Sequence, residues 1–410
     1  MLRAETELRV GLKVGPEGVG INDLVTEIFE RKDEVCGRIV AGLLWRIQEA
    51  WLNQVLAGEA ELACPGCGVV ERGPDSVLRR GRRRRRVRTS VGRLEFDLRQ
   101  VTCRWCRKTW CPFAERLGLE PRQRVLEELL RRLVDWVTEL SYQKTSSLGG
   151  EWLGSTVSPR RLHREVQERG AAVEFTEQGP LETLVADGTK VPAGGKERGE
   201  DVSLAFQIRG RTRRNGRPAV DKRVVGFGIG WGHWQETLAT ATEPELLVTD
   251  GEPGVAELAE WYFSGTRHQR CEWHLSYGLG HALGKDGLTV EERKPLAGKL
   301  SGILARGGAK ARKHYETFTD QLEGYPRAHS LLTNAEPHIL YSPPSAERTT
   351  SVMEREMREV NRRTDVGARW SLWGIANLLK LRLAKRHNPD DYERVWGPLQ
   401  KPALTLVSSC

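Results

Sequence analysis

Two pairs of cysteines with the same internal spacing are the clearest chemistry in this sequence. Cys64 and Cys67 enclose Pro-Gly, and Cys103 and Cys106 enclose Arg-Trp. This spacing lets two thiolates reach one tetrahedral Zn²⁺, and a second pair completes a set of four sulfur ligands. Four protein ligands leave no open position, so we expect a structural zinc site and not a catalytic one. Four unrelated thiols are the alternative interpretation.

An arginine-rich run, RRGRRRRRVR, lies between the two cysteine pairs. Its basic residues are Arg79, Arg80, Arg82, Arg83, Arg84, Arg85, Arg86 and Arg88. Leu94, Phe96 and Leu98 alternate after a turn at residues 91–93, which predicts a β-hairpin with one cysteine pair at each end, as in a zinc ribbon. We interpret the run as a DNA-binding patch, because each phosphate that it neutralises releases counterions. A solvated charged surface is the alternative.

The segment from Ser141 to Gly170 has the pattern of a helix-turn-helix. A glycine-containing turn is followed by Ser158 and Pro159, which are typical of a helix N-cap and first turn. The second helix would present its basic residues to a DNA groove, as a recognition helix does. These residues are Arg160, Arg161 and Arg164. Any hairpin of two helices can share this pattern.

Two aspartates at the ends of apolar runs could form a carboxylate site. Asp187 ends the run LVAD, Asp250 ends the run LLVTD, and each is followed by glycine. Asp-Gly is also a common turn signal. Carboxylates at the ends of two core strands could, however, share divalent cations, since Mg²⁺ needs only one or two carboxylates besides substrate phosphate and water. A later helical stretch offers a third acid from among Glu347, Glu354, Glu356 and Glu359.

The composition favours a globular protein with a polyanionic partner. The chain has 410 residues, of which 39% are hydrophobic and 29% charged, and its net charge is +9. That positive balance favours nucleic acid as a partner without naming it. No apolar run approaches the ~18 residues of a membrane span, and the N-terminus has no leader pattern, so we expect a cytoplasmic protein. Eight cysteines in such a protein favour metal binding over disulfides.

The sequence resembles the bacterial insertion-sequence DDE transposases related to the Mutator-like superfamily. The first two matching segments are VADGTKV around Asp187 and LLVTDGEPGV around Asp250. The third, RCEWHL, carries Cys271 and His274 and looks like the C/D-x2-H signature of the family. The fourth, TTSVMEREMREVNRRTDVGARW, carries Glu354, and Ser351 in this segment stands where the family more often has asparagine. The resemblance covers roughly residues 64–386.

This resemblance implies an RNase H-like catalytic domain with a helical insertion between the second aspartate and the glutamate. Asp187, Asp250 and Glu354 would then be the catalytic acids and would hold two Mg²⁺ or Mn²⁺ ions, with Asp187 bridging both. Water would cut the transposon end, and the freed 3′-OH would attack target DNA. Cys271 and His274 would shape the site, and the alternative is that His274 assists near the scissile phosphate.

We therefore expect an α+β multidomain protein that acts as a metal-dependent DDE transposase. Its partners would be the terminal inverted repeats of its element and target DNA, and it would act at the nucleoid as a homodimer or higher oligomer, away from membranes. A non-catalytic DNA-binding regulator and an RNase H-like nuclease outside transposition are the alternatives. The expected parts are a helical N-terminal region (1–62), the zinc ribbon (63–116), the helix-turn-helix region (117–175), the first part of the RNase H-like core (176–270), a helical insertion (271–340), the final core helices (341–387) and a C-terminal tail (388–410).

Overall fold

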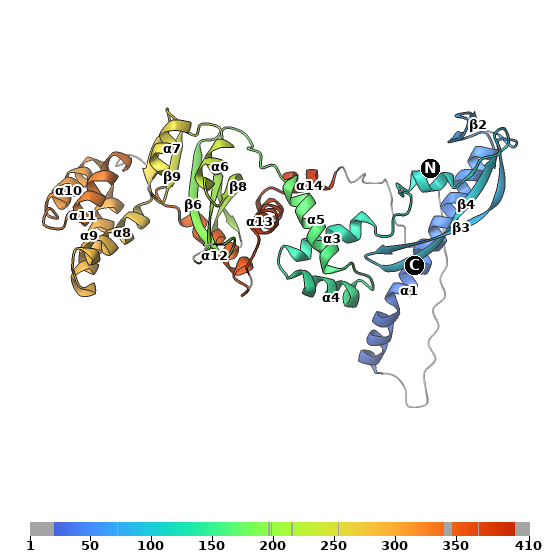
Figure 1. Cartoon of the computed structure of the whole chain (residues 1–410), viewed down its shortest axis with the longest axis horizontal. Coiled ribbons are helices and arrows are strands. Elements are labelled where there is room, and N and C mark those ends of the chain that lie inside the picture. The colour runs from blue at the N-terminus through green and yellow to red at the C-terminus, as the bar shows by residue number, and fades with distance from the viewer. Residues whose placement is uncertain are drawn as a thin grey trace. The chain divides into compact units, whose positions relative to one another are not determined.

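The computed structural model describes residues 20–397 apart from residues 72, 196, 198, 215, 253, 340–346 and 368. The protein has the expected α+β class, with one mixed sheet and two antiparallel sheets (Figure 1). The chain divides into two compact units, Met1–Glu165 and Val166–Cys410. Within the described part of the chain, no helix combines the length and the apolar character needed to cross a membrane.

A long antiparallel hairpin forms the centre of the first unit. Strands β3 (Val77–Thr89) and β4 (Gly92–Cys103) pair along their length, β5 (Thr109–Trp110) adds to β4, and β1 (Leu62–Ala63) pairs with β2 (Val70–Glu71). The predicted alternation on β4 is confirmed, because Leu94, Phe96 and Leu98 are all buried. The turn occupies residues 90–91, slightly earlier than predicted.

Helix α1 (Ile21–Leu56) packs against this hairpin and confirms the helix expected in the N-terminal region. Residues 1–19 of that region lie outside the described residues. Gln48 is nearly fully buried on α1, and its side chain joins the helix to the strand backbone. Its amide nitrogen donates to the carbonyl of Asp97 at 2.9 Å, and its oxygen accepts from the N–H of Arg99 at 2.9 Å. Both hydrogen-bonding groups of the buried amide are therefore satisfied.

Four helices follow the hairpin. They are α2 (Pro112–Arg116), α3 (Glu127–Val137), α4 (Tyr142–Trp152) and α5 (Pro159–Ala171). Gly149 on α4 lies so close to α3 that a Cβ atom there would be 2.7 Å from the Leu133 side chain. The predicted start of α5 is confirmed, since the Ser158 hydroxyl accepts from the N–H of Arg161 at 3.3 Å. The boundary between the two units falls inside α5.

The second unit is built on a five-stranded mixed sheet. Its strands are β6 (Thr183–Val191), β7 (Glu200–Arg214), β8 (Arg217–Ile229), β9 (Leu246–Thr249) and β10 (Arg267–Arg270), in the order β10-β9-β6-β7-β8. Strands β6, β7 and β8 are antiparallel neighbours, whereas β9 is parallel to both β6 and β10. Strands β6 and β9 confirm the apolar runs that lead to Asp187 and Asp250 as strands, but β6 continues past Asp187 to Val191. Strand β10 was not predicted, because its sequence RHQR lacks the apolar alternation that identifies a strand.

Helices cover both faces of this sheet (Figure 1). Helices α12 (Ser351–Thr364) and α13 (Leu372–His387) pack on one face, and α6 (His233–Ala239) and α7 (Val255–Tyr262) pack on the other. Alternating glycines on β8 permit the close approach of α6. A Cβ atom at Gly226 would lie 2.1 Å from the Thr237 carbonyl oxygen, and one at Gly228 would lie 1.9 Å from that of His233. The glycines thus serve packing.

The described residues of the expected insertion form helices joined by short turns and loops, and they have their own core. Its elements are α8 (Glu272–Lys285), α9 (Val290–Arg306), α10 (Gly308–Asp320), α11 (Pro326–Ala335) and a short 3₁₀ helix at Glu336–His338.

The expected C-terminal tail instead begins with a packed helix, α14 (Pro389–Trp396). Arg223 on β8 is 1% exposed, and it forms ion pairs with Asp390 and, at 2.8 Å, with Asp391. The side-chain amide of Asn388 also donates to the carbonyl of Val224 at 2.8 Å. These long-range partners hold the segment on the sheet, and the local sequence does not reveal them. Residues 398–410 of the tail lie outside the described residues.

Candidate functional site

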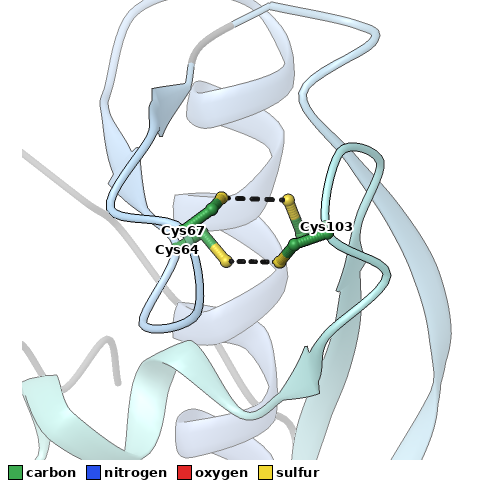
Figure 2. Close-up of side chains that lie close together, drawn as sticks. Cys64, Cys67 and Cys103 are labelled. Atoms are coloured by element: carbon green, nitrogen blue, oxygen red, sulfur yellow. Dashed lines mark hydrogen bonds between the residues drawn. The ribbon is translucent and has the colours of Figure 1, made fainter.

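The four predicted cysteine ligands come together in the first unit. Their sulfur atoms all lie within 4.8 Å of one another. The Sγ atoms of Cys64 and Cys106 are 3.5 Å apart, and those of Cys67 and Cys103 are 3.8 Å apart (Figure 2). Four sulfurs at ~2.3 Å from a tetrahedral Zn²⁺ would be about 3.8 Å apart. The cluster can therefore hold a metal ion such as zinc.

The protein environment of these thiols also fits a metal site. Burial acts to raise the pKa of Cys64, but hydrogen bonds from the backbone of Cys67 and Gly66 and with neighbouring thiols lower it to about 7. Burial raises the pKa of Cys103 to about 12. Thiolate must form at all ligands for zinc to bind, so metal binding would release protons. Gly66 favours the close approach of the two cysteine pairs, because a Cβ atom there would lie 3.0 Å from the Cys106 sulfur.

The predicted arginines lie on strand β3, where successive side chains point to opposite faces. Arg84 on one face pairs with Glu95 at 3.1 Å, and Arg86 pairs with the same carboxylate at 2.5 Å. Arg82 on that face lies 3.8 Å from Asp97. The sequence pattern does not distinguish the arginines of the run. In the structure, the positive charge of Arg82, Arg84 and Arg86 is largely neutralised by Glu95 and Asp97 of β4.

The other members of the run have different surroundings. Arg83 and Arg85 lie opposite Leu98 and Phe96 in the β3–β4 register. At the strand ends, Arg79 donates to the side chain of Asn53, Arg80 is exposed, and Arg88 donates to the carbonyl of Thr156 at 2.9 Å.

The basic residues predicted for a recognition helix lie in the first turns of α5. Arg160 and Arg164 are exposed. Arg161 is half-buried and forms an ion pair with the buried carboxylate of Glu165. The ion pair with Glu165 sets Arg161 apart, although 41% of its side chain remains exposed.

Asp187 and Asp250 lie on the same face of the five-stranded sheet. Strands β6 and β9 are parallel neighbours, with Val185 opposite Val248. Both valines point to the face covered by α12, as their shared core cluster shows. Each aspartate is two residues further along its strand direction, so its side chain emerges on that same face. Thr189 on β6 contacts Asn361 on α12 at 2.9 Å, in agreement with this placement.

The Asp250 carboxylate is close enough to Asp187 to influence the protonation of Asp187. Asp187 is 5% exposed, and Asp250 is half-buried. Burial raises the pKa of Asp187 to about 6, with the negative charge of Asp250 acting in the same direction. The charge of His274 and hydrogen bonds with Thr350 and Gly188 oppose the increase. Two partly buried carboxylates with this mutual repulsion are suited to sharing a cation.

Cys271 and His274 lie beside the acids and are joined by Thr350, a residue that the sequence did not single out. The N–H of Cys271 donates to the carbonyl of Thr249 at 2.7 Å, directly before Asp250. The N–H of Thr350 donates to the Cys271 sulfur at 3.3 Å, and its hydroxyl lies 3.2 Å from Nδ1 of His274. Burial acts to lower the pKa of His274, but Cys271 and the two aspartates raise it overall.

The four glutamates offered as a third acid have different environments. All but Glu354 are engaged with basic side chains. Glu347 pairs with Arg211, Glu356 with Lys222 and His387, and Glu359 with Arg382 and Arg386. Glu354 is half-buried, lies one helical turn after Thr350, and has no ion pair among the described residues.

Asp187, Asp250 and Glu354 do not form one tight cluster of ligand atoms. Among the described residues, the four cysteines form the only group of three or more His, Cys, Asp or Glu whose ligand atoms all lie within 4.8 Å. Asp187 and Asp250 are thus brought together, and Glu354 lies on the helix that packs over Asp187 without completing such a group.

Neither a protein-family model nor a curated protein matches this chain. A function is therefore inferred from the cysteine cluster, the basic hairpin and the two aspartates on adjacent parallel strands.

Proposed function

We propose that this chain is a metal-dependent DDE transposase that cuts and joins DNA at the ends of its own insertion sequence. The observation that carries this proposal is the position of Asp187 and Asp250. They follow opposed residues on adjacent parallel strands and share one face of the sheet, and the negative charge of Asp250 acts to raise the pKa of Asp187. Glu354, on the helix over that face, is the third acid.

The architecture supports an RNase H-like core. A mixed five-stranded sheet has helices on both faces, and a helical block with its own core lies between Asp250 and Glu354 in the chain. This is the order of parts that the resemblance to insertion-sequence transposases implies. In the first unit, the cysteine-bounded hairpin and α5 would form the DNA-binding zinc ribbon and helix-turn-helix.

The residues of the second unit fit divalent cations. Asp187 and Asp250 supply hard oxygen ligands of the kind that Mg²⁺ and Mn²⁺ prefer, and Glu354 would add a carboxylate when DNA is bound. Such ions would activate the attacking oxygen and stabilise the leaving oxygen of the phosphodiester. Thr350 holds Nδ1 of His274, so the ring keeps a defined orientation beside the two carboxylates. The partners would be terminal inverted repeats and target DNA, with two ends paired by an oligomer at the nucleoid.

A cleavage assay on the DNA that flanks this gene tests the proposal. Asp187→Asn keeps the size of the side chain but removes its charge, and we expect metal-dependent nicking to fall by at least about 100-fold, as expected when an essential metal ligand is lost. Asp221→Ala is the control, because Asp221 is an exposed acid on β8 that pairs with Arg209 at 2.8 Å. Tight binding with no cleavage by the unaltered protein, in either Mg²⁺ or Mn²⁺, would favour a non-catalytic regulator.

A further inference from the structure

A groove lined mostly by arginines runs beside strand β3 in the first unit. It encloses about 390 Å³ and is lined by Arg83, Arg84, Arg85, Arg86, Arg122, Gln123 and Arg124. None of these lining residues is acidic. The guanidinium groups of Arg84 and Arg86 pair with Glu95, whereas Arg83 and Arg85 lie opposite apolar residues of β4. Arg122 and Arg124 are distant in sequence from the arginine run, so the sequence pattern did not identify them as part of the same surface.

The groove is held by backbone contacts between β3 and the segment after α2. Arg88 forms a parallel bridge with Val125, its N–H donates to the carbonyl of Arg124 at 2.8 Å, and its carbonyl accepts from Leu126 at 3.0 Å. The Arg85 guanidinium donates to the carbonyls of Glu120 and Gln123, at 3.2 and 3.3 Å. Arg85 is thereby oriented beside the segment that carries Arg122 and Arg124.

The backbone of Arg122 is in a conformation that favours glycine. Its φ is +66°, and such a conformation costs a non-glycine residue about 1 kcal/mol or more. Glycine would relieve that strain, but arginine places a further positive charge on the groove. Strained residues of this kind cluster at binding sites.

Several positive charges around one cavity repel one another unless an anion lies between them. Guanidinium groups are planar donor forks that match phosphate oxygens in a bidentate arrangement. Arg83 and Arg85, two residues apart on an extended strand, have Cα atoms about 6.8 Å apart. This separation is similar to the step between successive phosphates of a nucleic-acid strand, so the groove suits a linear polyanion better than an isolated anion.

We propose that this groove binds the phosphate backbone of DNA through Arg83, Arg85, Arg122 and Arg124. Arg82, Arg84 and Arg86, which face the acids of β4, contribute much less. The inference rests on the proposed function for its choice of DNA as the polyanion. Such contacts position the duplex and do not read its sequence, so the groove binds the flanking repeat and an unrelated duplex with similar strength.

The test measures DNA affinity of the full chain between 50 and 200 mM salt, settings chosen to span the strong salt dependence of phosphate contacts. The probes are two fluorescein-labelled duplexes, one with the flanking repeat and one unrelated, without added Mg²⁺. For Arg83→Gln/Arg85→Gln we expect a loss of roughly 10-fold or more on both duplexes, and a slope of log affinity against log salt that is smaller by about 1 to 2. The control Arg31→Gln/Arg38→Gln changes two exposed arginines of α1 that pair with Glu27 and Glu34 and lie outside the groove lining. It should change affinity by less than about 3-fold with its slope unaltered.

A second variant guards against misfolding of the first, because Arg85 also bonds two backbone carbonyls. Arg122→Gly removes a groove charge and relieves a strained backbone, so it should fold at least as well as the unaltered protein and still bind both duplexes more weakly. Equal losses in the control and groove variants, or unchanged salt slopes in the groove variants, would overturn the proposal. Failure of DNA cleavage would instead count against the transposase and leave this binding result intact.

Discussion

Gly68 and Arg107 occupy equivalent positions in the two cysteine knuckles, the turns formed by residues 64–68 and 103–107. Both have a positive φ, of +72° and +62°. Each follows the second cysteine of its pair. The N–H of Gly68 donates to the carbonyl of Cys64 at 2.9 Å, and that of Arg107 donates to the carbonyl of Cys103 at 3.1 Å. The two knuckles therefore use one backbone design, which glycine adopts freely and arginine adopts with strain.

Reciprocal substitutions at these positions should have opposite effects on stability. Gly68→Ala places a Cβ atom in the left-handed region and should lower the free energy of unfolding by about 1 kcal/mol. Arg107→Gly should leave it unchanged or raise it by up to about 1 kcal/mol, because the relief of strain exceeds the added entropy of the unfolded chain. Denaturant unfolding of the zinc-loaded protein measures both. A larger loss at Arg107 than at Gly68 would contradict the equivalence of the knuckles.

Zinc should bind at one ion per chain and depend on all four clustered cysteines. Cys103→Ala removes a buried ligand and should abolish stoichiometric zinc, since three thiolates at this site hold the ion far less tightly. Elemental analysis of purified protein gives the stoichiometry. Cys111→Ala is the matched control. Cys111 lies outside the cluster, so the Cys111→Ala protein should keep its zinc. Full zinc content in Cys103→Ala would rule out the four-sulfur site.

Glu354 and Glu356, two residues apart on α12, should separate catalysis from stability. Glu354→Gln should abolish metal-dependent cleavage and leave the melting temperature nearly unchanged, since no ion pair among the described residues involves Glu354. Glu356→Gln leaves Lys222 and His387, whose side chains are each 11% exposed, without their carboxylate and should cost about 3 kcal/mol of stability. Cleavage assays and thermal unfolding of both variants distinguish the roles. An active Glu354→Gln protein would reject Glu354 as the third acid.

The Glu356 carboxylate should also make stability depend on pH in the acidic range. Burial acts to raise its pKa, but the hydrogen bond from His387 and the charges of His387, Lys222 and Arg386 lower it from 4.5 to about 2. Its contribution is fully present above pH 4.5 and is lost as the pH falls from there toward 2. The free energies of unfolding of wild type and Glu356→Gln should thus differ by a constant amount between pH 5 and 7 and converge below pH 4.5. A difference that grows on acidification would exclude this lowered pKa.

Local patterns in the sequence were enough to predict much of the architecture. The spacing of Cys64, Cys67, Cys103 and Cys106 predicted a four-sulfur group, and the alternation of Leu94, Phe96 and Leu98 predicted its hairpin. Strands leading to Asp187 and Asp250 and the helix start at Ser158 were also predicted, although β6 continues past Asp187 to Val191 and only Asp250 stands at a strand end. The strands and helices depend on residues within a few positions of one another, so a short stretch of sequence contains the pattern that forms each element. The four-sulfur group joins two distant pairs, but each pair is recognisable from its own local spacing.

Only the tertiary structure showed which residues far apart in the sequence contact one another. Strand β10 exists because RHQR lies beside β9, and α14 is held because Arg223 meets Asp390 and Asp391. Thr350 also has long-range partners, because it contacts Cys271 and His274 although the helices of the insertion separate them in the sequence. Within the arginine run, Arg84 and Arg86 pair with Glu95 of β4, whereas Arg83 and Arg85 lie opposite apolar residues, and all four line a groove with Arg122 and Arg124. The physical reason is that charge pairing and burial depend on distance in space, and a one-dimensional pattern of residue types does not contain that distance.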